Sequence, residues 1–172
     1  MLTTPTSSNS LLLDWFHSND YELVEGSFYQ RHLSVCQYSV KLPGSKAEVE
    51  TVELNDPSEE AANAYIDAFK YIASKTPAGK HIFTLGSFIG AGEKVPAAYM
   101  RRRAQEILDP INKHFNSSAA IVGFKSNIVT LLGQGMIRLY QLTHPEHKQV
   151  LFLEIAVAMR HLQREALKHS KY

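Results

Sequence analysis

Strand and helix patterns alternate along this chain from Asp56 to Tyr172 with almost no interruption. Apolar runs of strand length at 81–85, 119–123 and 149–153 are separated by stretches in which apolar residues recur every three or four positions. Strands joined by helical connections of this length build βαβ units on a parallel sheet. The sequence therefore predicts a single α/β domain with a mixed, mostly parallel sheet of about five to six strands and about four helices.

The part of the chain ahead of this alternation has a different pattern. Residues 1–10 are rich in Ser and Thr and are expected to form a disordered lead before a single domain over residues 11–172. Alternation of apolar and polar residues, with β-branched and aromatic side chains, is typical of strands. It predicts strands at 21–25, 28–42 and 49–54, after a short helix at 11–17 that places Leu12, Trp15 and Phe16 on the domain.

The first long helix has a clear start signal. Asp56 is the expected N-cap, and Glu59, three positions later, completes a capping box. Further helices are expected from Pro96, from Ser126 and over 154–169. The residues expected on the inner faces of the first and last long helices are Ala62, Tyr65, Ile66, Phe69 and Ile72, and Ile155, Met159, Leu162 and Ala166.

Composition limits the kinds of protein that this chain can be. The single cysteine, Cys36, excludes an intrachain disulfide and a multi-cysteine metal site, which suits a reducing cytoplasm. No stretch approaches the roughly 20 apolar residues of a membrane span, and the first residues lack the features of a signal peptide. We therefore expect a cytoplasmic protein without a membrane span.

Charge is unevenly distributed along the chain. Residues 1–79 contain 5 Lys and Arg and 11 Asp and Glu, a balance of −6, whereas residues 80–172 contain 13 and 6, a balance of +7. Such asymmetry can guide head-to-tail self-association or attract an anionic partner, although the two halves can also intermix in one sheet. Nucleic acid is not an expected partner, because the chain is not basic overall.

The segments Ala119–Gly123 and Phe152–Ala158, with Leu162 and the three leading strands, form a pattern that resembles the STAS-like domains. This family is similar to bacterial anti-sigma-factor antagonists and is also compared with the CRAL-TRIO lipid-binding fold. The resemblance extends over roughly residues 21–165. It implies a non-enzymatic regulatory or protein-interaction module of bacterial type.

The resemblance also draws attention to one serine. In the antagonists of that family, a serine at the start of the second helix is phosphorylated, and the phosphate controls partner binding. The matching position here is Ser87, in the loop 86–92 that is expected after the strand at 81–85. The acidic residue that precedes the serine in the family pattern is absent, because Leu85 and Gly86 occupy these positions.

The glycine-rich loop Gly86–Lys94 is the main candidate for ligand or partner binding. A strand–loop–helix junction directs free backbone N–H groups and the helix dipole at one point, where an anion can bind. The loop is no Walker motif, because position 91 is Ala and Val95 follows Lys94. It can equally be a turn that needs glycine for its backbone angles. The candidate binding residues are Ser87, Gly90, Gly92 and Lys94 from this loop, and Arg101 and Arg102 from the helix that follows.

Other chemically versatile residues form no recognisable set. His144 and His147 lie three positions apart, but Pro145 interrupts a helix there and no third ligand follows, so we predict no metal and no cofactor. Cys36 has no base at bonding distance along its strand, since His32 is about 13 Å away in extended geometry. We therefore name no catalytic residue.

Three functions remain open from the sequence. The first is a non-enzymatic module that binds another protein, or itself, through the Gly86–Lys94 loop and the helix after it. The second is a small-ligand or lipid-binding domain with an aromatic pocket, and the third is an enzyme that acts on an anionic substrate at the same loop. The aromatic side chains expected to line a pocket are Phe28, Tyr65, Phe69, Phe88 and Tyr99.

Overall fold

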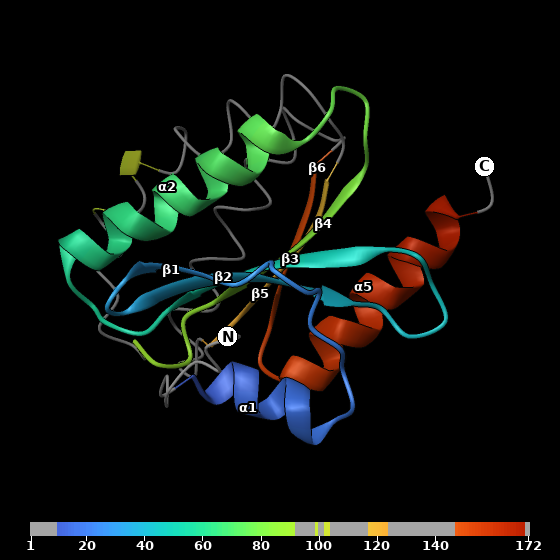
Figure 1. Ribbon diagram of the computed structural model, residues 1–172, viewed down its shortest axis with the longest axis horizontal. Coiled ribbons are helices and arrows are strands. Elements are labelled where there is room, and N and C mark those ends of the chain that lie inside the picture. The colour runs from blue at the N-terminus through green and yellow to red at the C-terminus, as the bar shows by residue number, and fades with distance from the viewer. Residues whose placement is uncertain (1–9, 92–98, 100–101, 104–116, 124–146, 171–172) are drawn as a thin grey trace.

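The chain folds around one mixed β-sheet (Figure 1). The computed structural model describes residues 10–91, 99, 102–103, 117–123 and 147–170. Six strands follow one another across the sheet in the order β1-β2-β3-β4-β5-β6, which is also their order in the chain. The α/β class and the mixed sheet of five to six strands are thus confirmed. β1 (Tyr29–His32), β2 (Val35–Lys41) and β3 (Glu48–Leu54) are antiparallel neighbours, whereas β4 (Ile82–Ser87), β5 (Ser117–Val122) and β6 (His147–Phe152) run parallel to β3.

Helices cover both faces of the sheet. α2 (Glu59–Lys75) lies on one face, and α1 (Leu11–Ser18) and α5 (Ile155–His169) lie on the other (Figure 1). The described residues thus contain three helices rather than about four. The helix expected from Ser126 lies outside them. Of the helix expected from Pro96 only Tyr99, Arg102 and Arg103 are described, and these are helical. Within the described residues, no helix is both long and apolar enough to cross a membrane.

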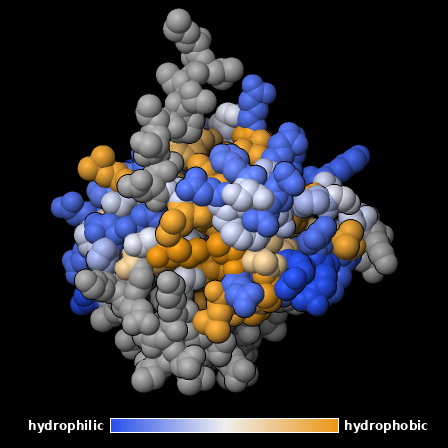
Figure 2. Space-filling view, turned by 90° about the horizontal axis from the view of Figure 1, so that it is seen from below, coloured by the Kyte–Doolittle hydropathy of each residue, from blue (hydrophilic) through white to orange (hydrophobic). Residues whose placement is uncertain are grey.

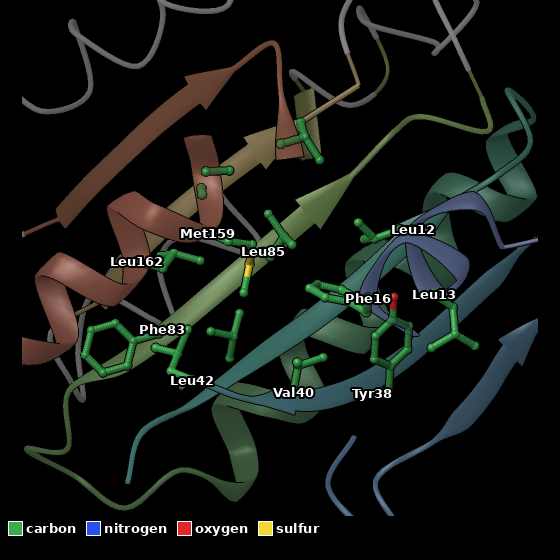
Figure 3. Close-up of a cluster of buried hydrophobic side chains, with 14 of the residues drawn as sticks. Leu12, Leu13, Phe16, Tyr38, Val40, Leu42, Phe83, Leu85, Met159 and Leu162 are labelled. Carbon is green, nitrogen blue, oxygen red and sulfur yellow. The ribbon is translucent and has the colours of Figure 1, made fainter. Parts of the chain in front are cut away.

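A hydrophobic core lies on each side of the sheet, because successive residues of a strand point to opposite faces. Beneath α1 and α5 the core includes Phe16, Leu85 and Met159 (Figure 3). Beneath α2 it includes Tyr65 and Val52. All five residues expected on the inner face of α2 are buried, and so are Met159, Leu162 and Ala166 of α5, while Ile155 is half-buried. Burying each large apolar side chain contributes about 1.5–3 kcal/mol.

The start of α2 differs from the expected capping box. Ser58, not Asp56, is the N-cap, and its hydroxyl oxygen accepts a hydrogen bond from the Ala61 backbone N–H at 3.2 Å. Asp56 instead accepts a hydrogen bond from the Ser58 hydroxyl. The helix therefore begins two residues later than the sequence predicts, because serine and aspartate are both good caps and only one of them can be the last non-helical residue.

The single strand expected over 28–42 is wrong. A turn at Leu33–Ser34 divides it into β1 and β2, and the expected strand at 21–25 contributes only an isolated bridge between Leu23 and Val40. The turn has no glycine, proline or asparagine to mark it. It is held by a side chain, since the Ser34 backbone N–H donates to His32 Nδ1 at 3.2 Å.

The short N-terminal helix is confirmed as α1. Leu12 and Phe16 are buried as expected, Trp15 is half-buried, and Leu13 is also buried. Ser10, assigned from the sequence to the disordered lead, is the buried N-cap of this helix. The rest of the expected lead, residues 1–9, lies outside the described residues.

Candidate functional site

The carboxyl ends of the parallel strands meet at one edge of the sheet, where open α/β sheets bind ligands. After β4, the segment 88–91 packs tightly against the ends of β3 and β5. A Cβ at Gly90 would lie 2.2 Å from Asn55 Oδ1. Gly123 has a φ of +110°, and a Cβ there would lie 2.5 Å from the backbone N of Ile89. Glycine is therefore required at both positions so that these strand ends can approach one another.

The described part of the glycine-rich loop uses most of its amides internally. The backbone N–H of Phe88 donates to the Val122 carbonyl at 3.0 Å, and that of Ala91 donates to the Phe88 carbonyl at 3.1 Å. The Ile89 N–H donates to the Ser87 hydroxyl at 3.4 Å. Three of the four amides in 88–91 thus already have acceptors, which leaves this segment poorly suited to cradle an anion. Gly92 and Lys94 lie outside the described residues.

Ser87 belongs to the sheet and not to the loop. It is the last residue of β4 and is 0% exposed. The strand register pairs it with Glu53 of β3. A phosphoryl group cannot be added to this hydroxyl while the residue remains fully buried.

Glu53 is the centre of a buried polar cluster under α1. The carboxylate is 1% exposed, and its Oε2 accepts hydrogen bonds from the Ser10 hydroxyl at 2.6 Å and from the Cys36 thiol at 3.1 Å. We call Ser10, Cys36, Tyr38, Glu53 and Ser87 the Glu53 cluster. Because the Ser10 hydroxyl also accepts the backbone N–H of Leu13 at 2.9 Å, this one side chain both caps α1 and attaches it to the sheet.

Two acidic groups of the Glu53 cluster, the Cys36 thiol and the Tyr38 hydroxyl, have raised pKa values. Burial, and next the neighbouring Glu53 carboxyl, raise the pKa of the Cys36 thiol well above its ordinary value. The same two causes, in the same order, raise the pKa of the Tyr38 hydroxyl. A thiol that stays protonated is a weak nucleophile, so the cluster is suited to docking α1 and not to covalent chemistry.

The arginines predicted to bind a partner are only partly described. Arg102 is exposed and lies over the ring of Tyr99, with 5.9 Å from its Cζ to the ring centre. The Tyr99 hydroxyl donates to Asn63 Oδ1 of α2. The described part of this helix therefore packs on α2. Arg101 lies outside the described residues.

The aromatic side chains expected to line a ligand pocket do not lie together around one. Tyr65 contacts both Phe69 and Phe88, with ring centres 5.0 and 5.1 Å apart, and all three are buried in the core under α2. Phe28 stacks on Tyr38 on the other side of the sheet, against the core beneath α1 and α5. These aromatic side chains fill cores. Among the described residues, no three His, Cys, Asp or Glu side chains gather as metal ligands, and His144 lies outside them.

A surface cluster that no sequence pattern revealed lies along the lateral edge of the sheet, where β1 meets α2. The Arg31 guanidinium is placed between two tyrosine rings, with its Cζ 4.2 Å from the centre of Tyr71 and 5.0 Å from that of Tyr29. Its Nε donates to Gln37 Oε1 at 2.9 Å. The Lys75 ammonium lies 5.6 Å from the Tyr71 ring centre. We call Tyr29, Arg31, Leu33, Tyr71 and Lys75 the arginine–tyrosine surface.

Exposure distinguishes this surface from the core clusters. Leu33, at the tip of the β1–β2 hairpin, is 94% exposed, and Tyr29 is 43% exposed. The only hint in the sequence is that Tyr29 and Arg31 are two apart on a strand and therefore share a face. Nothing in the sequence pairs them with Tyr71, because that contact depends on how α2 crosses the sheet.

The face formed by α1 and α5 offers a second exposed surface. Figure 2 shows apolar side chains gathered among polar ones on this side of the molecule. Leu11 of α1 and Leu167 of α5 are large apolar residues exposed on these helices. Arg160, Arg164 and Lys168 recur every four residues along α5, but Lys168 is paired with Glu165. Among the described residues of this face, no arginine lies between two aromatic rings as Arg31 does.

Comparison of the chain with protein-family models, with curated proteins and with solved structures gives no match.

Proposed function

We propose that this protein is a non-enzymatic, protein-interaction module of regulatory, STAS-like type, and that it binds its partner through the arginine–tyrosine surface. The single observation that carries the proposal is the ordered stacking of Arg31 between Tyr29 and Tyr71 beside the exposed tip at Leu33. Tyrosine and arginine dominate the energetically important positions of protein interfaces. Side chains that are ordered before binding lose little conformational entropy when a partner arrives.

The alternatives receive less support from the described residues. A lipid or ligand pocket would need the aromatic side chains that instead fill the core beneath α2. An anionic substrate would need loop amides that already donate within the protein. We place the module in the cytoplasm, because its single cysteine is a buried, free thiol.

A site-specific crosslinking experiment tests the proposal. A photoreactive amino acid replaces Leu33 in one variant and Leu167, which is 47% exposed on α5, in a matched control. We expect one partner to be captured from position 33 and not from position 167; capture of a second copy of this chain would identify the partner as itself.

The captured partner is then purified and its affinity is measured directly. We expect Tyr71→Ala to weaken binding by about tenfold or more, while Tyr71→Phe, which keeps the ring under Arg31, has little effect. Equal capture from both positions, or an affinity that ignores Tyr71→Ala in a correctly folded variant, would show that the interaction site lies elsewhere.

A further inference from the structure

No carboxylate of a described residue forms an ion pair with Arg31. Of the ion pairs formed by described residues, none involves Arg31 or Lys75, although both cations lie against the same Tyr71 ring. Two positive charges therefore lie against one aromatic ring, and neither forms an ion pair with a described residue. Gln37, which accepts the Arg31 Nε–H, is a neutral acceptor.

The Arg31 side chain also has an unused donor. Its Nη2 is buried and has no hydrogen-bond partner among the described residues. Buried polar groups are normally paired, and a guanidinium presents its N–H groups as a planar fork that matches a carboxylate. Stacking on Tyr71 and the bond to Gln37 hold this fork in place before any partner arrives. Arg31 as a whole is half-buried, so a partner carboxylate would meet the part of the guanidinium that remains exposed, and the buried Nη2–H would pair with it only when the covering atoms move.

The backbone next to Arg31 favours an extended partner. β1 is the first strand of the sheet and pairs, among the described residues, with β2 alone, so no described strand covers its outer edge (Figure 1). β1 is only four residues long and its register shifts between Gln30 and His32. A short, irregular edge of this kind discourages indiscriminate strand pairing. A segment that adds to it therefore needs side-chain recognition as well as backbone hydrogen bonds.

We propose that the partner segment is an extended, acidic stretch of protein that lies along the edge of β1 and presents an Asp or Glu carboxylate to Arg31. This inference rests on the proposed function and specifies the partner for the same surface. Lys75 adds attraction at longer range, which salt screens. The tip residue Leu33 supplies an apolar contact beyond the end of β1.

The test uses two short peptides with the full-length protein. One peptide alternates Val and Glu, and the other replaces every Glu by Gln, so the side chains keep nearly the same size and the two peptides differ chiefly in charge; both are used at concentrations at which they are monomeric. Binding is followed by NMR through the backbone amides of 29–35 and the side-chain Nε–H of Arg31. At about 50 mM salt we expect the acidic peptide to bind on the order of tenfold more tightly than the neutral one. We also expect this advantage to shrink as salt is raised.

Variants of Arg31 test whether this residue causes the preference for the acidic peptide. Arg31→Gln is expected to remove most of the preference for the acidic peptide, leaving only the attraction of Lys75, and Arg31→Lys to retain part of it, because lysine keeps the charge but loses the planar fork. Arg164→Gln is the matched control: it removes the same charge from an exposed position on α5, across the sheet, and should change nothing.

Three outcomes would overturn the inference. Equal affinities for both peptides, with shifts still at β1, would reject the acidic partner and leave the interaction module standing. Shifts that map to α5, or no shift at β1 up to millimolar peptide, would reject β1 as the edge for an extended segment. In that last case a crosslinked partner at position 33 would still support the module, so the two proposals fail separately.

Discussion

Glu53 and Arg31 are both ionisable side chains, but their surroundings in the protein differ. Glu53 lies in the core and is stabilised by neutral donors, the hydroxyl of Ser10 and the thiol of Cys36. Arg31 lies at the surface and is stabilised by aromatic rings and one neutral acceptor. Charge-assisted hydrogen bonds to a buried carboxylate are among the stronger single contacts in a fold. At the scale of residues, Glu53 serves stability, whereas Arg31 is available for recognition.

The docking of α1 can be measured through Cys36. The thiol is buried beneath this helix, so a thiol reagent can react only when the structure opens. Ser10→Ala removes both the N-cap and the bond to Glu53, which together contribute about 2 kcal/mol. We expect the rate of Cys36 labelling under native conditions to rise by about tenfold or more.

Ser74→Ala is the control for this measurement. It removes an exposed hydroxyl that, among the described residues, donates to the Tyr71 carbonyl within α2. Its labelling rate should match that of the parent protein. A rate for Ser10→Ala that is no faster than that of Ser74→Ala would mean that Ser10 does not hold α1 in place.

At the scale of elements, periodicity predicts most of the fold and local signals predict its boundaries poorly. The inner faces of α2 and α5 follow from three- and four-residue spacing because burial on one helix face imposes that period. The turn at Leu33–Ser34 escapes detection, because the alternation continues through it and its residues are not turn formers. β4 extends to Ser87, two residues beyond the expected strand, and this small error moves the main candidate residue from a loop into the core.

The binding residues are predicted less well than the elements. Ser87 and Gly90 are described, but the first is buried beside Glu53 and the second is packed against Asn55. The arginine–tyrosine surface joins residues of β1 to a residue of α2 some forty positions away. Such a contact depends on helix packing across the sheet, which one sequence does not encode in any local pattern.

The close approach of the residues that follow β5 to those that follow β4 gives a prediction at the scale of elements. Gly123→Ala should destabilise the protein by about 2 kcal/mol or more, because the residue combines a positive φ with backbone atoms of Phe88 and Ile89 within contact distance. Gly79→Ala is the matched control, with a φ of +79° but open space around it. Its cost should be about 1 kcal/mol. Urea unfolding of both variants measures the difference, and equal losses would mean that the close approach to Ile89 adds nothing.

At the scale of the whole molecule, the raised pKa of Cys36 predicts sensitivity to alkali. The unfolded thiol ionises near 9.0, whereas burial keeps the folded thiol protonated to higher pH. The unfolded state therefore binds fewer protons above pH 9, and the free energy of unfolding falls as the pH rises, with full stability below that value. The slope contributed by one thiol approaches about 1.4 kcal/mol per pH unit.

Cys36→Ser separates this contribution from those of the buried tyrosines. The serine hydroxyl can still donate to Glu53 but does not ionise in this range, so the loss of stability between pH 9 and 10 should be much smaller in the variant. Chemical denaturation at half-unit steps of pH measures both curves. Parallel curves would show that the folded thiol ionises as easily as the unfolded one.

The order of the strands has a consequence for how the molecule is made. Each strand pairs with the one synthesised just before it, so the sheet can grow from β1 to β6 as the chain leaves the ribosome, without waiting for a later strand to fill a gap. All the residues of the arginine–tyrosine surface fall between 29 and 75, which is within the first half of the 172 residues. A partner that recognises this surface can therefore meet it on a nascent chain, before the second half of the sheet exists.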